Sequence, residues 1–290
     1  MKIRYSFSSR RTRKIDNICR QRQKYPSVAR KIVEISDIVL EILDARFPEE
    51  TRNTELEQEI LRQNKKIIYV FNKADLTTKR IEEQIKKEFY PFVLVSCTKR
   101  KGIKDLRDLI KRIANDLEKR ERREIKRDRI VIGEEGKIKV GVIGYPNTGK
   151  SSLLNLLAGK SAAGVGAEAG FTKGIQKVRL SQEIVLIDSP GVIPDEQYSS
   201  ANKSIISDHT MFGGKSFSQV KDPEIVVARI MEKYPKILDR HYCIDSNGDC
   251  DELIENLGRK RGFLIRGGKV NGDQVARLIL RDWQEGRIKL

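Results

Sequence analysis

The stretch Gly144-Tyr145-Pro146-Asn147-Thr148-Gly149-Lys150-Ser151 decides how this chain folds. It fits the pattern G-x-x-x-x-G-K-[ST], follows the apolar residues 138–143 and opens a helical segment that runs to about Leu157. Glycines let the backbone wrap around a phosphate, so that successive N–H groups and the helix N-terminus face the anion. The placement predicts a phosphate-binding loop between a buried strand and a helix, rather than an ordinary turn with a chance lysine.

Each side chain of this loop has an expected task at a nucleotide. Lys150 would bring a positive charge to the outer phosphates, and we count it as a catalytic residue; the Ser151 hydroxyl would ligate Mg²⁺. Asn147 could hold K⁺ beside the bridging phosphate oxygens, or it could simply stabilise the turn. The expected nucleotide contacts of the loop are Asn147, Thr148, Gly149, Lys150, Ser151 and Ser152.

Asn72-Lys73-Ala74-Asp75 follows a second apolar run, residues 67–71. The Asp75 carboxylate can accept hydrogen bonds from N1 and the exocyclic amine of guanine, which adenine cannot supply, while Asn72 and Lys73 buttress the pocket. Alone, this pattern also suits a turn before a helix cap. Joined to the phosphate loop, it predicts GTP or GDP as the ligand. Ser96-Cys97-Thr98 would complete the pocket, with a backbone N–H near Cys97 reaching the base oxygen.

Asp188-Ser189-Pro190-Gly191 fits D-x-x-G and follows the apolar residues 184–187. Asp188 would hold Mg²⁺ through water, and the Gly191 N–H would sense the terminal phosphate, which makes the following segment a switch. The candidate Mg²⁺-sensing threonine is Thr172, because of its G-F-T context, with Thr148 and Thr210 as alternatives. The expected catalytic residues are Lys150, Thr172 and Gly191, and the expected metal ligands are Ser151, Thr172 and Asp188 for Mg²⁺ and Asn147 for K⁺.

Val192 stands after Gly191, where many small GTPases place a glutamine that orients the attacking water. A valine side chain cannot orient water. We therefore expect slow intrinsic hydrolysis, stimulated by a partner or by an added cation at the phosphates.

Apolar runs that alternate with helical segments predict an α/β fold with a mostly parallel sheet. A helix is expected through Leu117, and 11 of the 12 residues from Glu118 to Arg129 are charged, which predicts a solvated helix extension or linker. Because the guanine-reading loops precede the phosphate loop, the sheet should be circularly permuted, with its switch feeding directly into a small helical C-terminal domain. The expected strands are residues 38–43, 67–71, 92–95, 138–143 and 184–187. The expected units are a basic arm (1–27), the P-loop GTPase domain (28–207) and the C-terminal domain (208–290).

The charge of the chain points to a polyanionic partner. Lys and Arg number 58 against 41 Asp and Glu, a net charge of +17, and the first 31 residues hold eleven basic side chains and one acid. The last 33 residues hold nine basic side chains and three acids. Both ends therefore predict contact with RNA, whereas the mixed charges of residues 118–129 suit a merely solvated face.

Cysteine usage and hydropathy predict a cytoplasmic protein. The longest unbroken apolar run has five residues, Ile67 to Phe71, against the roughly 20 that a spanning helix needs. Nothing resembling a signal peptide opens the chain. Cys19, Cys97, Cys243 and Cys250 are too few and too scattered for a disulfide framework, which favours a reducing compartment. We expect a monomer that does not contact a membrane.

These motifs, and their order, resemble the circularly permuted GTPases of the YlqF/RbgA type. Asp44-Ala45-Arg46-Phe47-Pro48 with Arg52-Asn53 matches the signature D-A-R-x-P and R-N of that family. The resemblance covers nearly the whole chain and implies a role in assembly of the large ribosomal subunit, with its precursor and rRNA as partners. The C-terminal residues in the family's pattern are Arg261-Gly262, Gly267-Gly268, Asp273, Ala276, Asp282 and Gly286.

The sequence departs from the family in two respects. Some bacterial members have an N-terminal histidine proposed to aid hydrolysis, but the histidines here are His209 and His241, so no catalytic histidine is expected. Ala169 stands where the first switch often has proline.

Three functions remain to be compared. The preferred hypothesis is a GTP-hydrolysing switch that docks on a ribosomal precursor as the GTP form and leaves as the GDP form. The second is a nucleotide-gated RNA-binding scaffold with negligible turnover, which Val192 favours. The third, a metabolic kinase, is disfavoured by the guanine-reading residues 72–75.

Overall fold

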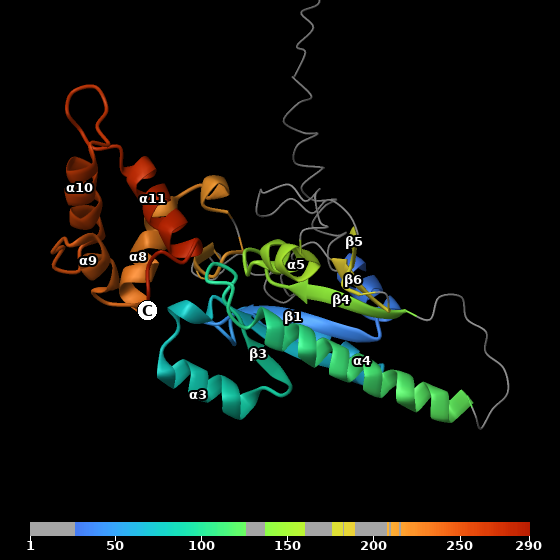
Figure 1. Cartoon of the computed structure of the whole chain (residues 1–290). Helices are drawn as coiled ribbons and strands as arrows, with labels where there is room; N and C mark the ends of the chain where they lie inside the picture. Colours follow the sequence, from blue (N-terminus) through green and yellow to red (C-terminus); the bar gives the residue numbers. More distant parts are fainter. Residues whose placement is uncertain are drawn as a thin grey trace, which may run out of the picture.

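A six-stranded sheet forms the centre of the molecule (Figure 1). The computed structural model describes residues 27–125, 137–159, 176–181, 183–188, 208, 210–214 and 216–290. In the order β3-β2-β1-β4-β6-β5, all neighbouring strands are parallel except β5 and β6. The strands are β1 (Ile38–Asp44), β2 (Lys66–Asn72), β3 (Phe92–Leu94), β4 (Ile138–Gly144), β5 (Gln176–Arg179) and β6 (Ile184–Asp188).

The sheet joins two separate blocks of sequence. β1, β2 and β3 come from the first block, β4, β5 and β6 from the second, and the blocks meet where β1 pairs with β4. All five expected strands are present. The sixth, β5, was not predicted: its sequence Gln-Lys-Val-Arg is too polar to stand out, and it forms an antiparallel edge.

Alternate residues of the strands pack against helices on the two faces of the sheet, as a strand's period of two requires. Ile38, Leu40 and Ile42 share a buried cluster with side chains of α4 (Ile103–Ile125) and α5 (Lys150–Ala158). Val39 and Leu43 share another cluster with the helix over residues 27–35, α2 (Thr54–Arg62) and α3 (Lys79–Glu88). The charged extension predicted for α4 is confirmed as helix up to Ile125.

Glu41 interrupts the apolar pattern in the middle of β1, because its carboxyl group is fully buried where an apolar side chain would be expected. Its Oε1 accepts the N–H of Asn53 at 2.8 Å. Nearby, Glu57 forms an ion pair with Arg52 at 2.6 Å and accepts the hydroxyl of Tyr69 at 3.1 Å. Burial, and then the charge of Glu57, raise the pKa of Glu41 well above its ordinary value.

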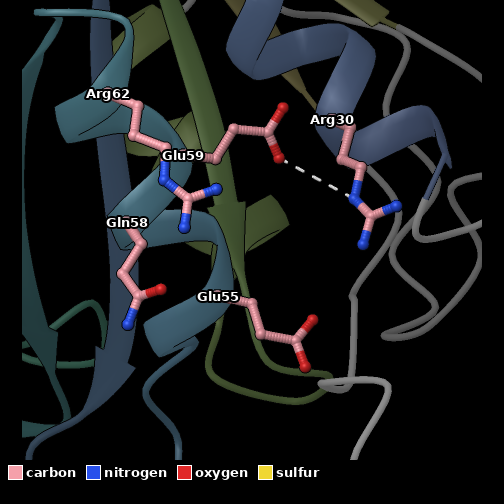
Figure 2. A pocket seen from close by; sticks show the side chains of 5 residues that line it. All are labelled: Arg30, Glu55, Gln58, Glu59 and Arg62. Carbon is pink, nitrogen blue, oxygen red and sulfur yellow. Dashed lines mark ion pairs between the residues drawn. The ribbon is translucent and has the colours of Figure 1, made fainter.

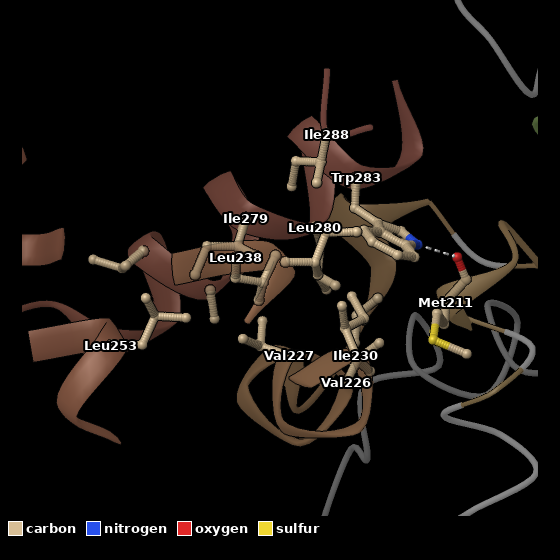
Figure 3. Close-up of a cluster of buried hydrophobic side chains, with 14 of the residues drawn as sticks. Met211, Val226, Val227, Ile230, Leu238, Leu253, Ile279, Leu280, Trp283 and Ile288 are labelled. Carbon is tan, nitrogen blue, oxygen red and sulfur yellow. Dashed lines mark hydrogen bonds between the residues drawn. The ribbon is translucent and has the colours of Figure 1, made fainter. Parts of the chain in front are cut away.

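Four helices at the C-terminal end of the chain pack around a third buried cluster (Figure 3). Phe47 and Tyr145, which follow β1 and β4, reach into this cluster. The ring of Trp283 is fully buried, stacks on Phe47 with 5.8 Å between centroids, and donates its Nε1–H to the carbonyl of Met211 at 3.0 Å. The helices are α8 (Pro223–Lys233), α9 (Ile237–Tyr242), α10 (Cys250–Arg261) and α11 (Gly272–Gln284). They therefore adjoin the sheet through the residues that follow β1 and β4.

No helix in the described part of the chain has both the length and the apolar character needed to cross a bilayer.

Candidate nucleotide-binding site

The sequence motifs lie at the carboxyl ends of neighbouring parallel strands. Asp44 ends β1, Asn72 ends β2, Gly144 ends β4 and Asp188 ends β6. Parallel strands bring their carboxyl ends to one edge of a sheet, and open α/β sheets bind ligands at the point of that edge where the order of the strands reverses. The two sequence blocks meet at this point, between β1 and β4.

The Lys150 amine lies buried inside the phosphate loop. It donates to the carbonyls of Gly144 at 3.0 Å and Tyr145 at 2.8 Å. Burial lowers the pKa of Lys150 to about 8, and the charge of Asp188 opposes this shift. The negative charge of a bound phosphate would raise this pKa again and keep the amine protonated. Asp188 lies close enough for its charge to raise the pKa of Lys150.

The turn needs glycine at position 149. Gly149 has φ +92°, and a Cβ added there would lie 2.2 Å from Nδ2 of Asn72. Gly144 is similarly enclosed, because a Cβ at that position would lie 2.4 Å from the carbonyl oxygen of Ile42. Both glycines therefore let the loop approach its neighbours more closely than any other residue would allow.

Asn72 connects three loops through one side chain. Its Nδ2 donates to the carbonyl of Thr148 in the phosphate loop at 2.8 Å, and its Oδ1 accepts the N–H of Cys97 at 3.2 Å. Only 3% of Asn72 is exposed. The residues predicted to read guanine and to hold phosphate thus lie side by side. Because the Cys97 N–H already serves Asn72, the base oxygen would need another N–H of that loop.

Lys73 contacts both the end of β1 and the phosphate loop. It adopts a left-handed backbone conformation, φ 63°, and its amine donates to Asp44 at 2.8 Å and to the carbonyl of Asn147 at 3.0 Å. Burial would raise the pKa of Asp44, but the charges of Arg46 and Lys73 outweigh burial and hold it well below its usual range.

Asp75 has an oxygen available for a ligand. Among the described residues, its buried Oδ1 has no hydrogen-bond partner, while Oδ2 lies 3.9 Å from the amine of Lys99. The neighbouring loop is ordered by its own contacts: the hydroxyls of Ser96 and Thr98 lie 3.1 Å apart, and the Lys99 N–H donates to Ser96. A buried carboxylate oxygen without a donor fits a base that offers N–H groups, as guanine does.

The remaining expected residues fall into two groups. Ser151 and Ser152 lie in the first turn of α5, directly after Lys150. Thr172 and Gly191, with Val192, lie outside the described residues. Thr210 is buried, and its carbonyl accepts the side-chain amide of Gln284 at 3.0 Å.

Asn147 has a further contact that the sequence did not predict. Its Nδ2 donates to the carbonyl of Gly213 at 2.8 Å, and its backbone is left-handed, φ 60°. The side chain therefore ties the phosphate loop to residues that follow the D-x-x-G segment.

The sequence analysis named Asp44 and Arg46 only as parts of a signature. It did not predict that Asp44 accepts hydrogen bonds from both Arg46 and Lys73 beside the candidate site. The available signal was position, because Asp44 follows an apolar run just as Asn72 and Asp188 do.

A separate pocket lies between the helix over residues 27–35 and α2 (Figure 2). Its lining side chains are Arg30, Glu55, Gln58, Glu59 and Arg62. Arg30 and Glu59 form a partly exposed ion pair at 3.7 Å. None of the five belongs to the predicted motifs, so we do not assign this pocket to the nucleotide.

The chain is similar to several GTP-binding proteins. Residues 139–238 match the family model of 50S ribosome-binding GTPases. An uncharacterised GTP-binding protein of Methanocaldococcus jannaschii is 36% identical, over 90% of this chain and 65% of the relative. The GTPase Grn1 of Schizosaccharomyces pombe is 31% identical, over 92% and 61%. Nucleolar GTP-binding protein 2 of Saccharomyces cerevisiae is 32% identical, over 89% and 51%. The chain thus spans between half and two thirds of the length of these relatives.

Among solved structures, YlqF of T. maritima in its GNP-bound form superposes with a TM-score of 0.59 over 92% of this chain and 97% of that one, at 22% identity. At that identity the likeness shows a shared fold. It agrees with the permuted order of the motifs around the sheet.

Proposed function

We propose that the chain is a circularly permuted GTPase of the YlqF type, which binds GTP and GDP at the carboxyl edge of β1, β2, β4 and β6 and hydrolyses GTP slowly. The observation that carries this proposal is the double hydrogen bond of Asn72 to Thr148 and Cys97. It joins the guanine-reading loops and the phosphate loop, from distant parts of the chain, into one site.

Each described residue has a defined task in this proposal. Asp75 accepts hydrogen bonds from the guanine edge through its buried, unpartnered oxygen. Lys150 leaves the carbonyls of Gly144 and Tyr145 and turns its charge to the outer phosphates. Asn72 and Lys73 hold the two loops at a fixed separation.

Mg²⁺ fits the oxygen donors that the chain offers here, Ser151 and Asp188, with Thr172 as the third proposed ligand. When bound, Mg²⁺ would neutralise charge on the phosphates. For K⁺ the proposed ligand is the side-chain oxygen of Asn147, whose amide nitrogen is already engaged with Gly213. Catalytic roles for Lys150, Thr172 and the Gly191 N–H stay part of this proposal.

We further propose that the partner is a precursor of the large ribosomal subunit and that basic ends of the chain contact its rRNA. The support is the net charge of +17, the match to the family model of 50S ribosome-binding GTPases and the similarity to nucleolar GTP-binding protein 2. With Val192 in place of a water-orienting glutamine, the particle would trigger hydrolysis, and the GDP form would then leave.

Phosphate release from GTP, measured in KCl and in NaCl, with and without precursor particles, tests the proposal. We expect slow turnover alone and at least tenfold stimulation by particles, lost in Lys150→Ala and kept in Lys104→Ala, which removes an exposed lysine of α4. Equal rates in the two salts would remove the K⁺ role of Asn147.

Turnover that stays negligible on particles would instead favour the RNA-binding scaffold. Co-sedimentation separates the two further: retention with a non-hydrolysable GTP analogue and release with GDP supports the switch. Binding to particles that ignores the nucleotide contradicts it.

A further inference from the structure

We propose that Asp44, Arg46 and Lys73 form a latch that couples the carboxyl end of α11 to the nucleotide loops, so that the C-terminal helices set the affinity for guanine nucleotide. The inference rests on the proposed function. It assigns a positioning role to Asp44 and Arg46, neither of which belongs to the loops expected to contact the nucleotide.

The first part of the latch lies at the last turn of α11. Nη1 of Arg46 donates to the carbonyl of Trp283 at 2.9 Å, and the amine of Lys73 donates to the carbonyl of Gln284 at 3.1 Å. The last carbonyls of a helix have no intrahelical donor and carry partial negative charge, which favours cations. Two cations from the sheet edge, a buried Arg46 and a partly buried Lys73, therefore complete this helix end.

The second part is the sharing of the Lys73 amine. The same nitrogen donates to three acceptors, which are Asp44 and the carbonyls of Asn147 and Gln284. An ammonium group has three protons to donate, so all of them are used. An added Cβ at Gly286 would lie 2.4 Å from the side chain of Leu76, so α11 ends in tight contact with the segment after Lys73. Any shift of α11 thus disturbs a group that also holds the phosphate loop.

Asp44 holds the two cations together. Its Oδ1 accepts a hydrogen bond from Nε of Arg46 at 3.0 Å. Its Oδ2 accepts hydrogen bonds from Nη2 of Arg46 and from the amine of Lys73, each at 2.8 Å. Asp44 is 2% exposed and Arg46 4%. Removing one member of such a buried group leaves an uncompensated charge, so the three residues act as a unit.

A second route from α11 reaches the same loop residue. The side chains of Trp283 and Gln284 donate to the carbonyls of Met211 and Thr210, and the carbonyl of Gly213, in the same segment, accepts from Asn147. Both routes end at Asn147 of the phosphate loop. By linkage, a nucleotide that orders this loop also stabilises the position of α11. A partner that moves the C-terminal helices then changes the affinity for nucleotide by the same factor as the nucleotide changes the affinity for that partner.

The test compares Arg46→Gln with Arg277→Gln. Arg277 also joins α11 to a neighbouring segment, donating to the carbonyls of Phe217 and Val220, but these bonds do not involve the nucleotide loops, so it serves as a matched control. We expect Arg46→Gln to weaken binding of a fluorescent GDP analogue at least tenfold and to raise the KM for GTP more than it lowers kcat. Arg277→Gln should change GDP affinity less than twofold, although both variants lower the unfolding temperature.

Amide hydrogen exchange without nucleotide supplies a readout that is independent of GDP binding. Arg46→Gln should speed exchange both at Glu285 and Gly286, which close α11, and at Leu153, whose N–H bonds to Gly149 after the phosphate loop. Faster exchange at α11 alone, or equal loss of GDP affinity in both variants, would overturn the latch. If Arg46→Gln does not fold, Arg46→Lys replaces it in both experiments. Lysine keeps the positive charge but cannot donate to both oxygens of Asp44 as the guanidinium does. A wild-type protein that fails to bind GDP contradicts the proposed function, whereas the exchange comparison still decides the latch.

Discussion

The side-chain amide of Asn72 lies against Gly149 so closely that a Cβ at position 149 would come within 2.2 Å of Nδ2. The same nitrogen donates to the carbonyl of Thr148. The contact between the phosphate loop and the guanine-reading segment therefore requires that residue 149 has no side chain.

Gly149→Ala should displace Asn72 and break its bond to Thr148. Gly262→Ala is the matched control, because Gly262 closes α10 in the same left-handed region as Gly149, with φ +72°, and an added Cβ there meets nothing within 4 Å. The control should lose about 1 to 2 kcal/mol of unfolding free energy from the left-handed backbone alone. Urea unfolding should show a larger loss in Gly149→Ala, together with loss of GDP binding. Equal effects of the two substitutions on both measurements would contradict the contact.

Asp75→Asn should change the base that the site prefers. The unpartnered oxygen of Asp75 becomes part of an amide, which matches the carbonyl of xanthine better than the amine of guanine. Losing charge-assisted hydrogen bonds should weaken GDP binding by about ten- to a hundredfold and strengthen xanthosine diphosphate binding. Competition titrations measure the ratio, with Asp108→Asn on the exposed face of α4 as control. An unchanged preference for guanine removes Asp75 from the base site.

The pKa of Lys150, lowered to about 8 by burial, predicts proton uptake on nucleotide binding. At pH 8 the amine of the free protein is about half neutral, and phosphate would restore its charge, so binding should take up about half a proton. Calorimetry in buffers of different ionisation enthalpy should detect this uptake at pH 8, where the phosphates of the nucleotide are themselves ionised. Without nucleotide, the lowered pKa means that the unfolded state binds more protons, so stability from this group rises between pH 8 and 10.5. Buffer-independent heats at pH 8 would contradict the assignment.

Glu41→Gln should make the protein more stable than wild type at high pH. Burial raises the pKa of Glu41, so the folded state retains a proton that the unfolded state loses. Its stabilising contribution is full below the ordinary pKa of 4.5 and is lost as pH rises through the folded pKa, by at most about 1.4 kcal/mol per pH unit. Unfolding free energies at several pH values should therefore diverge in favour of the variant as pH increases. Exposed Glu83→Gln should show no such divergence.

Most of the sheet was predictable because each central strand is a short apolar run between loops. β5 was not, since an edge strand of mainly polar residues carries no pattern that separates it from a loop. Glu41 was assigned to a strand but not to a buried polar cluster. Its partners Asn53 and Glu57 come from the following loop and helix, and no periodicity identifies them.

The amino-acid sequence by itself determined the order of the motifs, the permuted parallel sheet and the expectation of a guanine nucleotide, because each depends on short patterns and on the alternation of strands and helices. Only the tertiary structure decided that Asn72 joins Thr148 to Cys97 and that Lys73 meets Gln284 across 211 positions of the chain. Hydrophobic periodicity records which face of an element is buried. The partner of a buried hydrogen bond depends instead on distances between remote segments, which become defined only when the elements pack.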